Sequence, residues 1–389
     1  MELLGLAEVE HNPRNSRTRA LEPAVDRARP TPIRDPRPGE DPAWTLSRRV
    51  LGGLVAALRA VAPRPPSPGP ETRLLEQFET VLAEERRGSL PSSEARRGLA
   101  RAVQGYMAAT LLSGVPPAGV PRAAPDGPAC AIDIDGVLEA DLIGFPFLTP
   151  AGALSLRALR AHGYTVFLAT GRSPDHVRDR CRAYGLAGGV AEYGSVVFDG
   201  ARERILVPPD AQAALARVRA FLDVQPGVVV DTRYVHVVRA YLPRPDGPRR
   251  QLGAGLVAAA LARAGDVPLR ICAGATQTDF LAGAVNKGTA MAGLLAGRPL
   301  AFAIGDAPED LAILRMAAFP AAPANADPAL REAGIPIMRG LVQRGLREAV
   351  GRFLGHAPGG CPACRPPALP PATRRYLRVL GFPDYSVAG

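Results

Sequence analysis

Short apolar runs alternate with amphipathic segments along most of the chain from Ala129 onward, and this alternation limits the fold more than any other feature. Runs such as "ACAIDID" from Ala129 and "YTVFLATG" from Tyr164 have the length of buried strands, and each is followed by apolar residues at helical spacing. Strands that alternate with helices pair in parallel. The sequence therefore predicts an α/β fold in which helices cover both faces of a parallel sheet.

A segment of different character interrupts this alternation. Residues 203–280 contain an apparent antiparallel hairpin, "GVVVDTRYVHVVRAYLP", then a helical segment and two more strand-like runs. We therefore expect a Rossmann-like core over residues 129–202 and 281–355, with an inserted α+β cap domain over residues 203–280.

The two ends of the chain differ from this core. Residues 1–41 are rich in Pro and Arg without an apolar period, which predicts a disordered tail. Residues 42–114 carry apolar residues at helical spacing, and we expect a small helical module there, tethered by a proline-rich linker over residues 115–128. Residues 356–389 are expected to form a C-terminal tail.

Composition and charge narrow the range of partners. The chain has 389 residues and a net charge of +10, but its arginines are spread out and no basic run is interleaved with aromatic residues, so no nucleic-acid partner is expected. The N-terminus lacks the basic and apolar regions of a secretory signal, and no apolar run is long enough to span a bilayer. We expect a cytoplasmic protein without a membrane partner, whose oligomeric state the sequence leaves unknown.

The cysteines form one motif of uncertain role. Five cysteines are too few and too scattered for a disulfide framework. Cys361 and Cys364 form "CPAC", and His356 lies shortly before them. A zinc site normally takes four ligands, of which only three are local here. Incidental cysteines, a zinc site and a redox pair therefore remain alternatives.

Polar motifs follow the strands of the predicted core. They are "DIDGV" with Asp133 and Asp135, "LATGR" with Thr170, "NKG" with Lys287, and "GDAPED" with Asp306 and Asp310. Each motif alone has an ordinary structural explanation, such as capping of a helix. Because ligands of open parallel sheets bind at the carboxyl ends of the strands, the motifs together predict one functional site.

The carboxylates suit phosphoryl transfer. A carboxylate is ionised at neutral pH, so Asp133 can attack phosphorus without a base, while Asp135 can protonate the leaving oxygen and later deprotonate water. Mg²⁺ prefers oxygen ligands, which Asp133, Asp306 and the backbone carbonyl of Asp135 can supply, with Asp310 completing or orienting the set.

Other motif residues can hold the phosphate. Thr170 and the backbone N–H groups of Gly171 and Arg172 can bind a phosphoryl oxygen. Lys287 is the only lysine among the 47 Lys and Arg residues of the chain. Because an ammonium is a compact point charge and a guanidinium a wide planar fork, a lysine at this position suits a small site between nucleophile and phosphate.

These motifs resemble those of the haloacid dehalogenase-like (HAD) phosphohydrolase superfamily over about residues 129–345, with Val137 at a position where threonine is common. The resemblance implies that Asp133 is the nucleophile and Asp135 the acid and base. It implies phosphate binding by Thr170 and Lys287. The Mg²⁺ acids would be Asp306 and Asp310.

The spacing of the motifs is similar to that of the Cof-like, sucrose-phosphatase-like and trehalose-phosphatase-like branch. Little chain separates Asp135 from Thr170, whereas the segment between Thr170 and Lys287 has room for a cap. "AEYGSVVF" resembles the "ENGA" segment of that branch, with Tyr193 in place of the usual asparagine, and "PANADP" resembles its "GNA" segment at Asn325.

Candidate residues of the cap would grip the leaving group of the substrate. They are Arg233, Tyr234, His236, Arg239 and Arg270, and Arg172, Tyr193 and Asn325 are further candidates for contact with the substrate. Strand alternation is expected to put Tyr234 and His236 on one face and Arg239 on the other.

The expected function is that of a Mg²⁺-dependent phosphatase that hydrolyses a small, anionic phosphomonoester, with a sugar phosphate as the expected class, through an aspartyl-phosphate. The alternatives are a phosphomutase-like phosphotransferase on the same site and a non-catalytic scaffold or regulatory protein of the same fold.

Overall fold

The computed structural model describes residues 42–62, 69–90, 92–114, 127–141, 146–200, 202–244, 249–274 and 276–380. The predicted disordered tail over residues 1–41 and most of the predicted linker over residues 115–128 lie outside these ranges.

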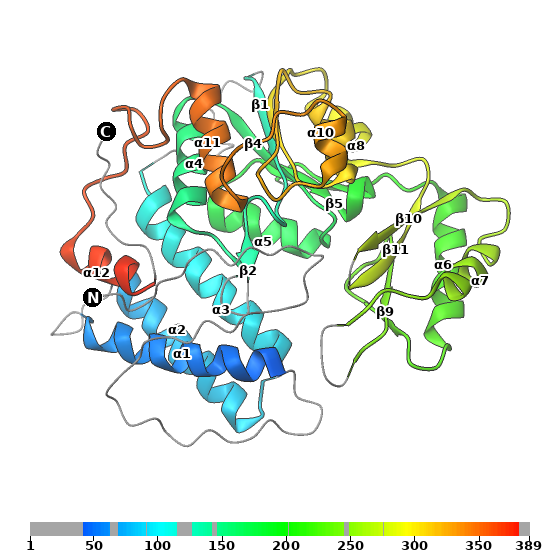
Figure 1. The fold of residues 1–389 in the computed structure, drawn as a ribbon, viewed down its shortest axis with the longest axis horizontal. Helices are drawn as coiled ribbons and strands as arrows, with labels where there is room; N and C mark the ends of the chain where they lie inside the picture. Colours follow the sequence, from blue (N-terminus) through cyan, green and yellow to red (C-terminus); the bar gives the residue numbers. More distant parts are fainter. Residues whose placement is uncertain are drawn as a thin grey trace.

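A mostly parallel sheet forms the centre of the molecule (Figure 1). In the described part of the chain its seven strands have the order β13-β12-β1-β4-β5-β6-β7. They are β1 (Ala129–Ile132), β4 (Thr165–Ala169), β5 (Gly188–Ala191), β6 (Val196–Phe198), β7 (Glu203–Ile205), β12 (Leu300–Ile304) and β13 (Phe319–Ala321). The strands from β13 to β5 pair in parallel, and β6 and β7 add antiparallel pairs at one edge.

Side chains that alternate along the central strands reach two separate apolar clusters. In β1, Cys130 and Ile132 join one cluster, whereas Ala129 and Ala131 join the other. Helices cover both faces, as predicted: α4, α5 and α11 lie over the first cluster and α8, α9 and α10 over the second. Their bounds are α4 (Pro150–Ala161), α5 (Pro174–Tyr184), α8 (Lys287–Leu295), α9 (Leu311–Leu314), α10 (Pro328–Glu332) and α11 (Val342–Leu354).

Short elements complete the core. They are the antiparallel pair β2 (Ala140–Asp141) and β3 (Pro146–Phe147) and the 3-10 turns η2 (Glu192–Gly194) and η3 (Pro308–Asp310). Residues 203–205, which the sequence analysis assigned to the cap, form β7 of the central sheet, so that boundary was wrong. The error has a simple cause: β7 pairs with β6 in the central sheet, but its side chains are all exposed and two of the three are charged, so it lacks the apolar run of a core strand.

The inserted cap is a separate antiparallel sheet with helices on one face (Figure 1). Its strand order is β10-β11-β9-β8. Its elements are α6 (Pro209–Asp223), β8 (Val229–Val230), β9 (Val238–Tyr241), α7 (Ala254–Ala262), β10 (Leu269–Gly274) and β11 (Gln277–Ala282). The cap has its own apolar cluster, in which Val218 and Leu222 of α6 pack with Val238 and Phe280 of the sheet. The prediction of an α/β core with an α+β cap is therefore confirmed.

The N-terminal helices are part of the core and do not form a separate module. They are α1 (Pro42–Ala60), α2 (Pro70–Arg87), α3 (Ser92–Met107) and the π-helical turn η1 (Ala108–Leu112). Buried side chains such as Leu58, Phe78 and Leu99 belong to the same apolar cluster as Ile132 of β1. The expectation of a tethered module was wrong, because the periodicity of a helix shows that it buries one face and does not show what covers that face.

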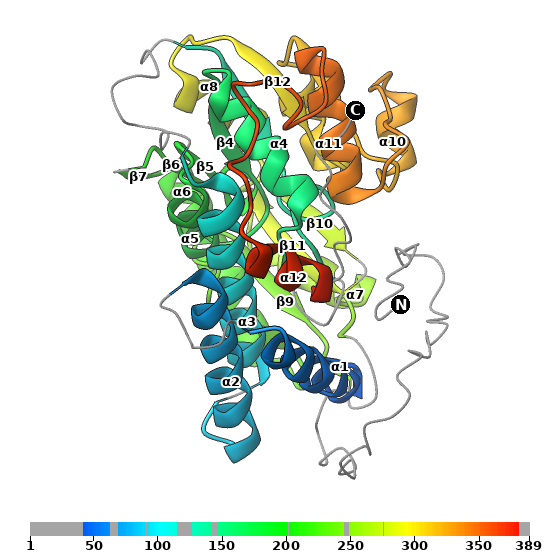
Figure 2. The same ribbon diagram turned by 90° about the vertical axis from the view of Figure 1, so that its left-hand side faces the viewer.

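The C-terminal segment also packs on this body. Helix α12 (Pro371–Val379) lies beside α1 and α2 (Figure 2). The rings of Tyr376 and Tyr106 are 6.2 Å apart between centroids, and the hydroxyl of Thr373 donates to Glu71 Oε1 at 2.5 Å. Residues 356–380 are therefore packed structure where a tail was expected, while residues 381–389 lie outside the described part. Among the described helices, none has the length and apolar character needed to cross a membrane.

The shared core can be tested with Phe78, whose side chain is 0% exposed. Replacing it by alanine removes a large buried ring, and we expect F78A to lower the free energy of unfolding by about 3–5 kcal/mol. Hydrogen exchange followed by mass spectrometry should become faster in α4 and α12 as well as in α2. Gln77→Ala, an exposed change in the same helix, is the control. Faster exchange confined to α1–α3 would show that the helices are an independent module.

Candidate active site

The polar motifs gather at one edge of the central sheet because the strands that precede them are parallel neighbours. Asp133 directly follows β1, Thr170 directly follows β4, and Asp306 comes two residues after the end of β12. β1 pairs with both of the other strands, so all three carboxyl ends lie at the same edge. This agrees with the general position of ligand sites in open α/β sheets.

Lys287 reaches this edge from the first turn of α8. The helix begins with a capping box, in which the Asn286 side chain accepts from the Thr289 N–H and Thr289 in turn accepts from the Asn286 N–H. Lys287 is only 3% exposed. Its Nζ donates to Asp133 Oδ1 at 3.2 Å and to Asp310 Oδ1 at 2.7 Å, so one ammonium links residues that are far apart in the sequence.

Asp310 is held by the turn that follows β12. Its Oδ2 accepts from the backbone N–H groups of Asp306 and Ala307, each at 3.1 Å, while its Oδ1 accepts from Lys287. A carboxylate with this many donors has a fixed orientation. Asp310 therefore orders both the Asp306 backbone and the lysine.

The carboxylates of the cluster could hold a metal ion. Asp133, Asp306 and Asp310 each offer an oxygen, and these atoms lie within 4.8 Å of one another. When all three carboxyls are ionised, the ammonium of Lys287 supplies one positive charge against their three negative charges. Hard oxygen ligands with an excess of negative charge suit a small divalent cation.

Gly136 lets the Asp306 carboxylate approach the loop after β1. Gly136 has φ +71°, and a Cβ atom built there would lie 1.9 Å from Asp306 Oδ2. The Asn325 amide donates to both the Gly136 carbonyl, at 2.9 Å, and Asp306 Oδ2, at 3.2 Å. Asn325 was expected to contact the substrate. Its amide instead bonds Asp306 to the loop after β1 and so orients the Asp306 carboxylate.

Burial and the neighbouring negative charges both raise the pKa of the carboxyls in the cluster. Burial raises the pKa of Asp133 well above its usual value, and the ammonium of Lys287 opposes this shift without cancelling it. Burial and the neighbouring Asp310 carboxylate raise the pKa of Asp306 to about 7. Added positive charge would stabilise the ionised forms of both carboxyls.

Asp135 pairs with Arg172 and is not one of the three carboxylates grouped above. Its oxygens accept from Arg172 Nε at 3.0 Å and 2.7 Å, and Arg172 Nη2 also donates to it. The Asp135 side chain is 57% exposed, which puts it at the mouth of the site. Desolvation raises the pKa of this carboxyl, but the charge and hydrogen bonds of Arg172 outweigh that effect and lower the pKa below its usual value.

The loop after β4 brings Thr170 and Gly171 to the same edge. Thr170 is fully buried, and its Oγ1 accepts from the Arg172 N–H at 3.2 Å. A Cβ atom on Gly171 would lie 2.3 Å from the ring of Tyr193. Glycine at this position therefore lets the tyrosine ring pack directly against the loop.

Tyr193 and Arg239 connect this loop to the cap. The Tyr193 hydroxyl donates to Asp279 Oδ2 in β11 at 2.8 Å. Arg239 in β9 forms a buried ion pair with Asp279 at 2.7 Å, and its Nη2 lies 3.4 Å from the Gly171 carbonyl. Through Arg239, the cap thus contacts Gly171, one of the residues that the sequence predicts to bind the phosphoryl group.

Glu192 forms a second connection between core and cap. Its buried carboxylate accepts from the backbone N–H groups of Val235 at 3.0 Å and His236 at 2.8 Å. Burial raises the pKa of Glu192, its backbone donors oppose the shift, and the resulting pKa is about 7. Sequence reasoning missed Glu192 and Asp279, because an acidic residue next to an apolar run gives no sign of a partner about 40 residues away.

The other cap candidates each bond to a different partner. Arg233 forms an ion pair with Asp231 at 2.5 Å. Arg270 Nη2 donates to the Val285 carbonyl at 3.1 Å, which lies next to the Lys287 motif. His236 meets Glu192 through its backbone N–H.

The expected alternation of cap side chains was wrong. Tyr234 and Arg239 lie together, with the guanidinium 3.9 Å from the centre of the tyrosine ring, although they were expected on opposite faces. The reason is that β8 ends at Val230 and β9 begins at Val238, so residues 231–237 form a turn in which strand alternation does not apply.

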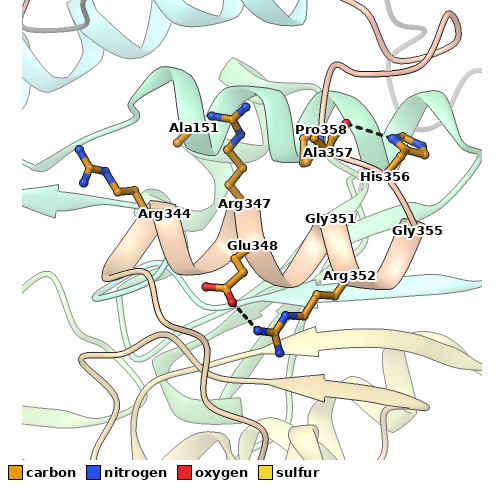
Figure 3. A pocket seen from close by; sticks show the side chains of 10 residues that line it. All are labelled: Ala151, Arg344, Arg347, Glu348, Gly351, Arg352, Gly355, His356, Ala357 and Pro358. Atoms are coloured by element: carbon orange, nitrogen blue, oxygen red, sulfur yellow. Dashed lines mark hydrogen bonds and ion pairs between the residues drawn. The ribbon is translucent and has the colours of Figure 1, made fainter. Parts of the chain in front are cut away.

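A surface hollow of about 710 Å³ lies elsewhere, along α11 (Figure 3). Its lining consists of Ala151, Arg344, Arg347, Glu348, Gly351, Arg352, Gly355, His356, Ala357 and Pro358. None of the motif residues lines it. The arrangement of carboxylates, lysine and threonine at the strand ends remains the candidate site.

Comparisons with known proteins found similar folds only among solved structures. No family model and no curated protein matches the chain. A haloacid dehalogenase-like hydrolase from Bacteroides thetaiotaomicron is 14% identical with a TM-score of 0.46, over 58% of this chain and 99% of that one. A HAD subclass IIB sugar phosphatase is 15% identical with a TM-score of 0.46, over 59% and 99%. A HAD phosphatase from Bacteroides thetaiotaomicron is 16% identical with a TM-score of 0.44, over 62% and 98%.

Gly136 offers a test of the metal site. A methyl group in G136A would displace the Asp306 carboxylate, which lies 1.9 Å from the added Cβ atom. We expect Mn²⁺ to bind to G136A at least about tenfold more weakly than to the unchanged protein by isothermal titration calorimetry. Gly163→Ala is the matched control, because Gly163 also has positive φ but has nothing within 4 Å of the added atom. Equal weakening in both variants would mean that backbone strain, and not displacement of Asp306, is the cause.

Glu192 gives a prediction about pH. The pKa of Glu192 is raised to about 7 in the folded state. At pH values between its pKa in the unfolded chain and about 7, the protein therefore takes up a proton when it folds. Its contribution to stability is present at low pH and is lost as the pH rises through about 7. We expect the unfolding free energy of the unchanged protein, relative to Glu192→Gln, to fall by roughly 3 kcal/mol between about pH 4.5 and 7.5. Urea unfolding at several pH values measures it, with the exposed Asp210→Asn as control. A pH-independent difference between the unchanged protein and E192Q would contradict the role of Glu192.

Proposed function

We propose that the chain is a phosphomonoesterase that transfers the phosphoryl group of a small phosphate ester first to Asp133 and then to water. The observation that carries this proposal is the contact between Lys287 Nζ and Asp133 Oδ1, 3.2 Å long, inside the carboxylate cluster at the strand ends. A buried ammonium beside a carboxylate nucleophile reduces the repulsion that an entering phosphate would otherwise meet. A structural role for the cluster gives no reason to bury this much like charge together.

Asp133 and Asp135 would carry the two chemical steps. In the first, a bond forms between the Asp133 carboxylate and phosphorus while the ester P–O bond breaks, and Asp135 gives its proton to the leaving oxygen. In the second, water attacks the aspartyl-phosphate, Asp135 takes a proton from that water, and Asp133 is released with inorganic phosphate. One carboxyl thus acts as acid and then as base.

Arg172 would control the protonation of Asp135. The ion pair between them favours the carboxylate, which is the form needed for the second step. The first step needs the protonated form. We propose that an entering phosphate dianion draws Arg172 away from Asp135 and so lets the carboxyl take up a proton.

Mg²⁺ is the cation that we propose for the cluster. Asp133, Asp306 and the backbone carbonyl of Asp135 would hold it, and Asp310 would orient Asp306 and Lys287. When bound, Mg²⁺ would supply positive charge to the phosphoryl oxygens and stabilise the ionised nucleophile.

The substrate would be a small anionic phosphate ester, with a sugar phosphate as the class we propose. Thr170, Gly171 and Lys287 would bind the phosphoryl group. Tyr193 and Arg239 are bonded to Asp279 and serve the contact between cap and core, so we do not assign the leaving group to them. Arg233, His236 and Arg270 are the remaining candidates for the leaving group.

The nucleophile is tested by phosphate release from a panel of phosphate esters in the presence of Mg²⁺. We expect Asp133→Asn to lower kcat by about 10³-fold or more, because the amide is a poor nucleophile. Asp223→Asn, an exposed change in the cap, is the control. Unchanged turnover in D133N, or no turnover of any ester by the unchanged protein, would contradict the proposal. An isomerised phosphate ester as product, in place of free phosphate, would favour a phosphomutase-like transferase.

Lys287 makes a second prediction. Because its Nζ is enclosed between two carboxylates at 3.2 Å and 2.7 Å, a guanidinium would have to displace one of them. We expect Lys287→Arg to lower kcat by at least about 100-fold although the charge is kept. Circular dichroism of K287R confirms folding. Full activity in K287R would mean that charge alone, and not the size of the ammonium, matters.

A further inference from the structure

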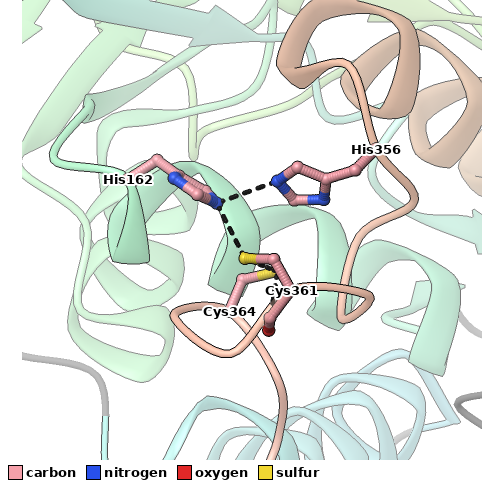
Figure 4. Close-up of side chains that lie close together, drawn as sticks. All are labelled: His162, His356, Cys361 and Cys364. Carbon is pink, nitrogen blue, oxygen red and sulfur yellow. Dashed lines mark hydrogen bonds between the residues drawn. The ribbon is translucent and has the colours of Figure 1, made fainter.

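The geometry points to a zinc site at the end of α4, formed by His162, His356, Cys361 and Cys364 (Figure 4). His162 directly follows α4, and the other residues lie in the segment after α11. Each side chain directs one donor atom toward the others, and these atoms lie within 4.8 Å of one another. Three of these ligands are close together in the sequence, and His162, from a distant segment, is the fourth.

The distances between donor atoms are close to those around a tetrahedral ion. His356 Nε2 and His162 Nε2 are 3.0 Å apart, Cys361 Sγ is 3.4 Å from His162 Nε2, and the sulfurs of Cys361 and Cys364 are 3.4 Å apart. Zn–S bonds of about 2.3 Å and Zn–N bonds of about 2.0 Å in tetrahedral geometry put the ligand atoms about 3.3–3.8 Å apart. A small outward movement of the side chains would therefore admit the ion.

Backbone groups hold two of the proposed ligands in position. His356 Nδ1 lies 3.0 Å from the Ala357 carbonyl. Since a carbonyl can only accept, the ring proton is on Nδ1, and Nε2 faces the cluster with its lone pair. The Gly359 N–H donates to Cys364 Sγ at 3.2 Å, a bond that fixes the position of this sulfur.

Arg157 of α4 fixes the loop that carries the cysteines. Its guanidinium donates to the carbonyls of Cys364 at 2.9 Å, Arg365 at 2.8 Å and Ser113 at 2.7 Å. The loop is therefore held against α4 next to His162 by bonds to backbone carbonyls, which do not use the proposed ligand atoms. Such preparation is typical of metal sites and is unnecessary for incidental surface cysteines.

The types of ligand atom indicate which metal would bind and what it would do. Two sulfurs and two imidazole nitrogens favour zinc over Mg²⁺, which needs oxygen ligands. A redox pair of Cys361 and Cys364 would require neither histidine. Four protein ligands leave no open position, so the site would be structural: zinc would displace the two thiol protons to solvent and fasten the C-terminal segment to α4.

A metal ion at this site would also stabilise the contact between the C-terminal segment and the N-terminal helices. After Cys364 the chain continues into α12, which lies beside α1 and α2. Loss of zinc should therefore loosen residues 356–380 more than the cap.

Metal analysis of the purified full-length protein tests the site. We expect about one zinc per chain, and about none in His162→Ala or Cys361→Ser. Asp306→Asn is the matched control and should keep its zinc, because Asp306 belongs to the carboxylate cluster. Zinc lost from D306N but kept in H162A would overturn the assignment, since the metal would then be in the carboxylate cluster.

Two measurements on the unchanged protein do not depend on the folding of any variant. Co²⁺ in place of zinc should give the visible absorption of a tetrahedral site with sulfur ligands, and removal of the metal by a chelator should lower Tm by about 5 °C or more and speed hydrogen exchange in residues 356–380. A protein without zinc that takes up no Co²⁺, with Cys361 and Cys364 either free or joined in a disulfide, would overturn the proposal.

Discussion

The buried ammonium of Lys287 is the contact on which the arrangement of the candidate site depends. It bonds Asp133 after β1 and Asp310 after β12, and it comes from the first turn of α8. Without a cation at this point, several carboxylates would be buried together with little to offset their charge. The lysine thereby makes a mostly negative site possible and leaves an excess of negative charge for a divalent ion.

The cap is joined to the core through residues that also surround this site. Asp279 accepts from both Tyr193 and Arg239, and Arg239 lies against the Gly171 carbonyl. Glu192 accepts hydrogen bonds from the backbone of Val235 and His236, in the turn between β8 and β9 of the cap. A movement of the cap would therefore act directly on the loop after β4, which we propose to bind the phosphoryl group.

The segments outside the core and cap are bound to the body on the side of α4. Side chains of α1 to α3 and of α12 share the apolar cluster on one face of the central sheet, so these helices complete the core. The cluster of His162, His356, Cys361 and Cys364 stands where the C-terminal segment meets α4. Apolar packing and, by our proposal, a metal ion would both hold that segment.

The sequence by itself determined the alternation of strands and helices, the position of the cap between Thr170 and Lys287, and the motif residues at the strand ends. These follow from local signals, since the period of apolar residues and the residue types after a strand do not depend on distant parts of the chain. Only the tertiary structure decided that Asp135 pairs with Arg172, that Glu192 and Asp279 hold the cap, that the N-terminal helices belong to the core, and that His162 joins "CPAC". The physical reason is that these are contacts of side chains between segments brought together by folding, and spacing along the chain carries no information about which surfaces meet.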